Sequence, residues 1–200
     1  MDFVLFGREF DVFYLVSQGF ALAAMILSLY AFQRRKKVQI LNYTVLSAVC
    51  SVFHYLFLGA WAGVATKGVG VVRNVFGAYE ASKHKTSKIA PLFFVSFYIV
   101  SGFFTYDSPI SLLPVVAASL YTIAIYFGDA SKLRRVAVLT SGLWLIYDIC
   151  VLSIVGIVAE AVFIFNDLIA IYRYRKKKKA KKRKPSGKIR GKSSKSRGRG

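Results

Sequence analysis

Seven long apolar segments, separated by short polar connections, constrain the fold of this 200-residue chain more than any other feature. A helix that crosses a bilayer needs about 20 largely apolar residues, because backbone polar groups in hydrocarbon must find their hydrogen bonds within the segment. Suitable segments occupy residues 12–33, 38–58, 62–80, 88–106, 110–128, 133–151 and 153–172. The sequence therefore predicts an all-α integral membrane protein with seven transmembrane helices.

The formal net charge of +20 is concentrated at one end of the chain. Of the 29 Lys and Arg residues, 16 lie in residues 173–200, where there is no acidic residue. Such a segment cannot bury enough apolar surface to fold alone, so we expect a disordered polybasic tail. Its predicted partners are anionic lipid headgroups, which attract basic residues beside a membrane span. Nucleic acid is the less favoured partner, because Tyr174 is the only aromatic residue that could stack on bases.

The basic residues of the body alternate between the two ends of the predicted spans. Basic connections follow the first, third and fifth segments, whereas the connections near Ala60, Asp107 and Ser153 hold almost no positive charge. Lys and Arg close to membrane spans are retained on the cytoplasmic side. We therefore expect residues 1–11 to lie outside, as a short N-terminal segment, and the tail to lie in the cytoplasm.

The body also contains an internal repeat. Residues 18–30 align with residues 114–126, and each copy continues through a basic turn into an aromatic-rich helix. The predicted architecture is a first three-helix repeat, a linker span and a second three-helix repeat, at residues 12–80, 88–106 and 110–172. Because the single linker span restores the direction of the chain, the two repeats are predicted to be parallel, with any substrate site between them.

Polar side chains inside the predicted spans are the candidates for function. An ionisable group in the bilayer interior costs about 2.5–3.5 kcal/mol on insertion scales, so it usually faces the bundle interior. The repeat matches Asp148 approximately with His54, and Arg73-Asn74 with Asn166-Asp167. The ionisable candidates are His54, Arg73, Asp148, Glu160 and Asp167.

These residues suggest a specific polar centre. We expect Asn74 and Asn166 to face each other across a cavity, and Arg73 and Asp167 to form a charge pair. Hydrogen bonding between helices is an equal alternative for the two asparagines. His54 is more simply explained as a structural residue, because no second metal ligand follows it at helical spacing.

Several short motifs resemble the YgjV family of bacterial inner-membrane proteins over about residues 14–175. They are Leu112-Leu-Pro-Val115, Ser153-Ile-Val-Gly156, Ala159-Glu-Ala161 with Asn166 and Tyr172-Arg173, Gln18-Gly19, and His54 before Leu58-Gly59. That family is similar to the PQ-loop and SWEET superfamily, which implies paired asparagines at a substrate cavity and proline hinges. Asn74 and Asn166 occupy similar places. Only Pro114 matches the hinge prolines, and Gln18 stands where its partner would lie, which disfavours rocker-type gating.

Two functions remain open from the sequence. The first is a small-solute transporter or facilitator of the plasma (inner) membrane, with a site formed by Asn74, Asn166, Gln18, His54 and Asp148. The second is a non-transporting membrane scaffold or receptor whose tail binds lipid or a cytoplasmic partner. The residues form no acid, base and nucleophile set, so we expect no enzyme activity, and no motif predicts a cofactor or a metal site. A homo-oligomer stays an open alternative to a monomer.

Overall fold

The computed structural model describes residues 4–5, 8–9, 11–32, 37–83, 87–127 and 130–183. Two strands of two residues each, β1 (Val4–Leu5) and β2 (Arg8–Glu9), pair in antiparallel orientation. The rest of the regular structure in this part of the chain is helical. The helices are α1 (Val12–Phe32), α2 (Lys37–Phe57), α3 (Trp61–Ser82), α4 (Ala90–Phe104), the 3-10 helix η1 (Pro109–Ser111), α5 (Leu112–Phe127), α6 (Ala130–Cys150) and α7 (Ile154–Arg183).

The seven α-helices confirm the predicted helical segments. Every helix begins within three residues of its predicted start, and every helix except α7 ends within two residues of its predicted end. Local sequence signals explain the sharp boundaries. Asp11 caps α1 by accepting a hydrogen bond from the Tyr14 backbone N–H at 2.7 Å, and Ser153 caps α7 by accepting one from the Gly156 N–H at 3.1 Å.

Helix α7 corrects the predicted boundary of the tail. The tail was expected to be disordered from residue 173, but the helix continues to Arg183. Lys, Arg and Ala are good helix formers, extension of an existing helix needs no new nucleus, and positive charge is favourable near a helix C-terminus. Pro185 lies soon after this end in the sequence and cannot continue a helix. The remainder of the predicted tail, residues 184–200, lies outside the described residues.

Three of the described helices are long and apolar enough to cross a membrane by themselves. They are the segments Val12–Ala31, Pro109–Phe127 and Ile154–Tyr172, in α1, η1 with α5, and α7. Helix α4 is apolar but shorter. Its outward face carries exposed phenylalanines, among them Phe103 and Phe104, each 81% exposed. A large exposed apolar surface of this kind is rare on soluble monomers and is typical of a lipid-facing surface.

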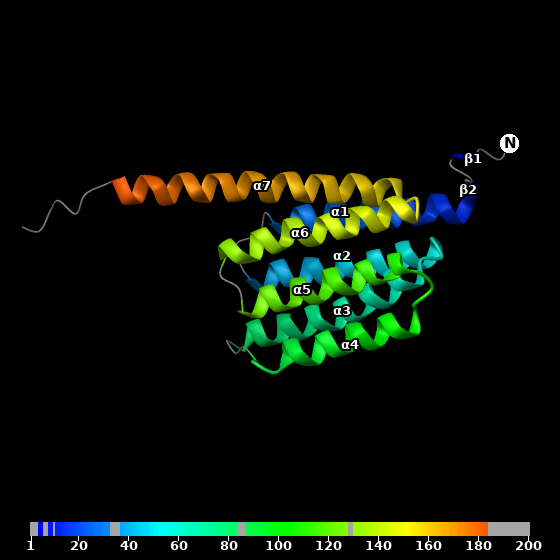
Figure 1. Cartoon of the computed structure of the whole chain (residues 1–200), viewed down its shortest axis with the longest axis horizontal. Helices are drawn as coiled ribbons and strands as arrows, with labels where there is room; N and C mark the ends of the chain where they lie inside the picture. The colour runs from blue at the N-terminus through cyan, green and yellow to red at the C-terminus, as the bar shows by residue number, and fades with distance from the viewer. Residues whose placement is uncertain are drawn as a thin grey trace, which may run out of the picture.

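The helices lie side by side along the long axis of the molecule (Figure 1). Helices α1, α3, α5 and α7 run in one direction, α2, α4 and α6 run in the other, and α7 projects beyond the bundle. Helix α2 packs between α1 and α3, and α6 packs between α5 and α7. Further contacts join α1 to α7, α3 to α5, and α4 to both α3 and α5.

Two turns of the chain have the same backbone structure, 93 positions apart. Among the described residues, φ is positive at Gly59 (71°), between α2 and α3, and at Leu152 (56°), between α6 and α7. Such a residue commonly ends a helix, and glycine adopts this conformation with less strain than leucine. The backbone hydrogen bonds of the two turns follow the same pattern. In the first turn the N–H groups donate as Leu58 to His54, Gly59 to Leu56, Ala60 to Tyr55 and Val64 to Ala60. In the second turn they donate as Val151 to Tyr147, Leu152 to Ile149, Ser153 to Asp148 and Ile157 to Ser153.

This correspondence fixes the register between the two turns. It pairs Tyr55 with Asp148 and His54 with Tyr147, whereas the sequence comparison had matched Asp148 with His54. The approximate match in the sequence therefore lies one residue from the structural register, because a comparison of two aromatic-rich helices has no internal marker of register. The positive-φ residue of each turn supplies that marker.

Candidate functional site

Tyr55 and Asp148 are joined by a hydrogen bond inside the bundle. Tyr55 lies in the last turn of α2, Asp148 lies in the last turn of α6, and the Tyr55 hydroxyl donates to Asp148 Oδ1 at 2.8 Å. Their side chains are only 3% and 1% exposed. A carboxyl group at such a position needs protein donors, because its removal from water is costly unless hydrogen bonds compensate. The bond therefore connects α2 to α6 and satisfies one carboxyl oxygen.

Two glycines make room for this pair. A Cβ atom on Gly63 would lie 2.6 Å from Tyr55 Cγ, and a Cβ atom on Gly156 would lie 2.7 Å from Asp148 Oδ2. Both distances are shorter than any ordinary carbon contact. The Gly63 N–H donates to the Tyr147 hydroxyl at 3.1 Å, so α3 is also tied to α6. The absence of a side chain at these two equivalent positions allows Tyr55 and Asp148 to pack against the starts of α3 and α7.

His54 links three parts of the bundle. Its Nδ1 lies 2.8 Å from the backbone carbonyl oxygen of Ser17 in α1, and its Nε2 lies 2.9 Å from Ser153 Oγ. A carbonyl oxygen can only accept, so Nδ1 donates, and Nε2 of a neutral ring then accepts from the serine hydroxyl. Both ring nitrogens are thus used by protein partners. This geometry matches the structural interpretation of His54 rather than a free substrate ligand.

Gln18 also has protein partners at both ends of its amide. Its Oε1 accepts from the Val155 N–H at 2.9 Å, and its Nε2 donates to Ser17 Oγ at 3.2 Å. The bond to Val155 satisfies one of the backbone donors that every helix leaves free at its N-terminus. Nearby, the Tyr14 hydroxyl donates to the carbonyl of Leu152 at 3.0 Å. Helix α1 therefore holds the α6–α7 turn in place.

Lys67 is the important residue that the sequence did not single out. Its Nζ lies 3.7 Å from the centroid of the Trp144 ring, a cation–π contact between α3 and α6. The Trp144 ring stacks on Tyr55, with centroids 5.6 Å apart. The Lys67 ammonium also interacts electrostatically with the carboxyl groups of Glu160 and Asp148. We call Tyr55, Lys67, Trp144, Asp148 and Glu160 the Lys67 cluster.

The Lys67 cluster combines opposite charges from equivalent positions. Lys67 and Glu160 are 93 positions apart, in α3 and α7, and so correspond to each other as Tyr55 corresponds to Asp148. Each is six residues from the start of its helix, a distance of about 9 Å along the axis at 1.5 Å per residue. Glu160 is buried, whereas Lys67 is half-buried. The equivalence to Glu160 is the signal that could have identified Lys67 from the sequence.

Arg73 and Asn74 form a second polar group near the middle of α3. The Asn74 side chain is buried, and its Oδ1 accepts from Arg73 Nε at 3.2 Å and from Nη2 at 3.0 Å. Arg73 Nη1 donates to Thr122 Oγ1 of α5 at 2.9 Å. Its guanidinium also lies over the Tyr121 ring, with Cζ 5.5 Å from the centroid. The contact with Thr122 joins α3 to α5.

The remaining predicted site residues lie at different depths. Asn166 is exposed and Asp167 is half-buried, while the Asp167 carboxyl interacts electrostatically with Tyr121. The facing asparagines and the Arg73–Asp167 pair stay predictions. Pro114 is buried in the first turn of α5, where a proline removes no hydrogen bond from the helix interior. Its hinge role also stays a prediction.

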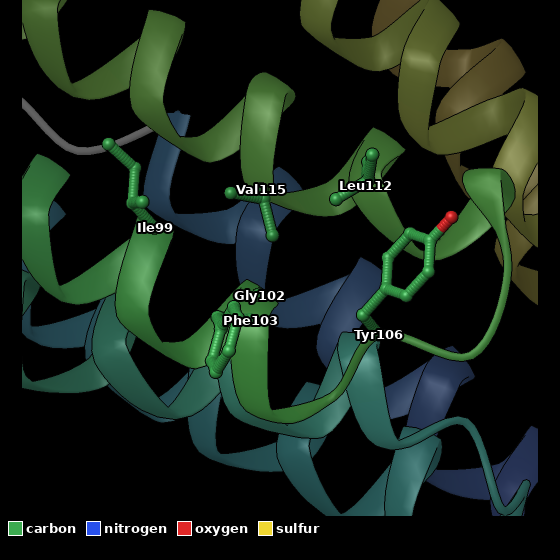
Figure 2. Close-up of a pocket in the computed structure, with 6 residues that line it drawn as sticks. All are labelled: Ile99, Gly102, Phe103, Tyr106, Leu112 and Val115. Atoms are coloured by element: carbon green, nitrogen blue, oxygen red, sulfur yellow. The ribbon is translucent and has the colours of Figure 1, made fainter.

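A separate apolar hollow lies between α4 and α5 (Figure 2). It has a volume of about 460 Å³ and is lined by Ile99, Gly102, Phe103, Tyr106, Leu112 and Val115. The lining is almost entirely carbon, and most of these side chains are exposed on the outer surface of the helices. Its chemistry suits an acyl chain or another apolar group. It contains none of the polar residues described above.

The interior of the bundle contains polar groups of several kinds. Ammonium, carboxyl, amide, hydroxyl and guanidinium groups from α2, α3, α5, α6 and α7 lie inside an otherwise apolar bundle, in the Lys67 cluster and around Arg73. Among the described residues, no three His, Cys, Asp or Glu side chains lie together as a metal site would require. Charged groups of both signs, Lys67 with Asp148 and Glu160, interact in this interior.

Comparison with known proteins gives one match. The model of the family Imp-YgjV, described as a bacterial inner membrane protein, matches residues 15–178. This match covers most of the body and agrees with the resemblance carried by the sequence motifs. No curated protein and no solved structure matches the chain.

Proposed function

The chain belongs to the YgjV family of bacterial inner-membrane proteins, and on that premise we propose that it is a small-solute transporter or facilitator with its site between two helical repeats. The observation that carries the proposal is the Lys67 cluster. Lys67, Asp148 and Glu160 come from three helices and interact inside the bundle. Ionisable groups at membrane depth usually mark a substrate or ion pathway, because burying them is costly.

The proposed architecture is two parallel three-helix repeats joined by α4. Three features support it. The α2–α3 and α6–α7 turns share one backbone pattern, at a constant separation of 93 positions. The contact of α1 with α7 has a counterpart in the contact of α5 with α3, as a two-fold axis between the repeats requires. Helices α3 and α7 also run in the same direction (Figure 1).

The proposed topology places all seven helices across the inner membrane, with the tail in the cytoplasm. Helices α2, α3 and α6 are each 21 or 22 residues long, about 32 Å at 1.5 Å per residue, which is sufficient to span hydrocarbon about 30 Å thick. Their polar side chains lower their hydropathy, but several of these side chains point into the bundle. Helix α4, with 15 residues, is the shortest, and a short span is accommodated by local thinning of the bilayer.

A structural role is the alternative explanation of the Lys67 cluster. Tyr55, Asp148, Lys67 and Glu160 could simply hold the two repeats together, as polar contacts between membrane helices do. The two explanations differ in what a ligand should do. A carrier binds a solute that prefers the folded state and therefore raises its thermal stability, whereas a structural pair has no such ligand.

The test is a thermal-stability screen of the detergent-purified full chain against several hundred small metabolites, followed by flux measurements in liposomes. We expect at least one compound to stabilise the wild type and not the Glu160→Gln variant. Glu80→Gln is the matched control, because Glu80 is also buried but lies at the other end of α3, where its carboxyl accepts from the Ser87 N–H. Equal stabilisation of all three proteins, or of none, contradicts a site at the Lys67 cluster.

A second candidate function is favoured by the extension of α7. The helix continues to Arg183, so basic residues project from the bundle on a helix (Figure 1). A scaffold or receptor could use this segment to bind anionic lipid, at about 1 kcal/mol for each basic residue near the surface. Truncation after Tyr174 separates the candidates. Loss of function with an intact Lys67 cluster would favour the scaffold, and retention of flux would favour the carrier.

A further inference from the structure

Tyr98 has the most deeply buried hydroxyl group of the described chain that lacks a hydrogen-bond partner. The residue lies in the middle of α4, is 0% exposed, and packs with Phe94 and Val115. Thr122 of α5 interacts with this hydroxyl, but the contact falls short of hydrogen-bond geometry and leaves the phenol without a partner. A buried hydroxyl left unsatisfied destabilises the folded state, so a group of this kind needs an explanation.

The hydroxyl of Tyr98 points toward the segment of α3 that carries Arg73. A Cβ atom built on Gly70 would lie 3.7 Å from Tyr98 Oη, and Gly70 is one helical turn before Arg73. Thr122, which accepts a hydrogen bond from Arg73, lies beside Tyr98 on the neighbouring helix α5. Three helices therefore bring a guanidinium and two hydroxyls to one place near the middle of the bundle.

The hydrogen-bonding capacity of this group consists mainly of donors. A guanidinium has five N–H donors, and the described bonds of Arg73 use three of them, two to Asn74 and one to Thr122. The Thr122 hydroxyl donates its own proton to the carbonyl of Ala118 at 2.7 Å. The groups that remain available to a ligand are the positively charged Arg73 guanidinium, with two unused N–H donors, and the phenol O–H of Tyr98. An oxyanion has the complementary chemistry, since it accepts several hydrogen bonds and neutralises the charge.

We propose that Arg73 and Tyr98 form a binding site for a small oxyanion, such as the carboxylate of the transported solute, and that Thr122 positions the Arg73 guanidinium. The inference rests on the proposed carrier function, because a solute reaches this depth only through a carrier. The site lies more than one helical turn deeper along α3 than Lys67. Lipid headgroups remain at the membrane surface, so a lipid phosphate is not the source of the oxyanion.

The charged and titratable groups around Arg73 define the competition for it. Tyr121 of α5 lies against the guanidinium, and Lys67 of α3 repels it. Asp167 and Glu160 of α7 interact with Tyr121 and so carry negative charge to the same region. An incoming oxyanion therefore competes with resident carboxylates. Removal of the Asp167 charge is expected to strengthen binding of the oxyanion.

The experiment measures ligand-induced thermal stabilisation of the detergent-purified full chain at constant ionic strength. The probes are acetate, benzoate and inorganic phosphate, with acetamide and benzamide as neutral counterparts of the two carboxylates. We expect the carboxylates to stabilise the wild type and the amides to have no effect. Arg73→Gln should abolish the stabilisation, and Asp167→Asn should increase it. If phosphate stabilises the protein and the carboxylates do not, the same site binds a solute that carries a phosphate group.

Tyr98→Phe is the sharpest variant, because it removes only the unpaired hydroxyl. Folding should be retained or improved, since the deleted group has no partner to lose. Affinity for the carboxylate should fall about tenfold, as expected for one hydrogen bond to a charged group. Tyr126→Phe is the matched control, because Tyr126 lies at the far end of α5 near Glu80. The affinity of this variant for the carboxylate should equal that of the wild type.

The outcomes separate this inference from the function on which it rests. Equal effects of carboxylates and amides, or unchanged affinity in both Arg73→Gln and Tyr98→Phe, would overturn the oxyanion site. If neutral or cationic compounds stabilise the protein through Glu160 while no oxyanion does, the carrier proposal stands and the oxyanion site is wrong. If no compound of any charge stabilises the protein, both are wrong.

Discussion

The Tyr55 hydroxyl donates a hydrogen bond to Asp148 across the interior of the bundle, and these two residues occupy equivalent positions in two turns of identical backbone structure. The same correspondence relates Lys67 to Glu160. In both cases the two equivalent positions carry complementary side chains, a donor with an acceptor or a base with an acid. Contacts of this kind need two different sequences, so two identical repeats could not make them.

Tyr55→Phe should destabilise the protein. The substitution keeps the ring but leaves Asp148 Oδ1 without its donor inside the bundle, which costs about 1–3 kcal/mol. Unfolding by denaturing detergent, followed by circular dichroism, measures the change. Tyr98→Phe is the control, because the hydroxyl of Tyr98 has no partner in the described structure and its removal should cost nothing. Similar losses in the two variants would argue against a specific role for the Tyr55–Asp148 bond.

Gly63→Ala should also lower stability, because the new methyl group would overlap the Tyr55 ring at 2.6 Å from Cγ. Overpacking of this kind typically costs about 1–3 kcal/mol. Gly68→Ala in the same helix is the control, since a Cβ atom there meets nothing within 4 Å and alanine is the better helix former. The melting temperatures should move in opposite directions. A neutral Gly63→Ala would show that α2 and α3 separate easily, contrary to the close contact seen here.

The helices could be predicted from the sequence because long apolar segments and turn residues mark them clearly. Gly59 and Pro109 stand at helix ends that lie within a few residues of the predictions. The end of α7 could not be found in this way, because the apolar segment ends at Tyr172 but Lys and Arg still favour a helix. Hydrophobicity defines a membrane span, whereas helix propensity decides how far the helix continues beyond it.

The candidate site was only partly predictable. Polarity inside the spans identified Asp148, Glu160 and Arg73, and the structure places the two carboxyl groups in the Lys67 cluster. Lys67 was missed because a single lysine six residues into an apolar helix can extend its ammonium toward the membrane surface. Its interaction with Trp144 and Glu160 depends on how distant helices pack. Short motifs contain no information on that packing until the register of the two turns is known.

Ser153→Ala should weaken the anchoring of the α6–α7 turn. The serine hydroxyl accepts from the Gly156 N–H and contacts His54 Nε2, so alanine removes a helix cap and a partner of the histidine together. A lost cap alone costs about 1 kcal/mol. Ser96→Ala provides the comparison, because Ser96 is exposed on α4 and bonds only the carbonyl of Leu92. Faster hydrogen exchange at the start of α7 should accompany the loss of stability, and unchanged exchange would contradict it.

Lys67 and Glu160 should be energetically coupled. Lys67→Met removes the cation that interacts with the Glu160 carboxyl, and Glu160→Gln removes one of the two anions that interact with the Lys67 ammonium, the other being Asp148. Each single substitution should cost about 1–2 kcal/mol, less than the 3–5 kcal/mol of a fully buried pair because Lys67 is only half-buried.

The double variant tests the coupling directly. Lys67→Met with Glu160→Gln should cost clearly less than the two single losses combined, because it removes both charges together. Lys67→Met with Glu80→Gln should instead be additive, since Glu80 lies more than three helical turns away on α3. Additive losses in both double variants would mean that Lys67 and Glu160 do not act as a pair. Lys67 and Glu160 would then contribute to stability independently, and binding of a solute between them would be the remaining explanation for their placement.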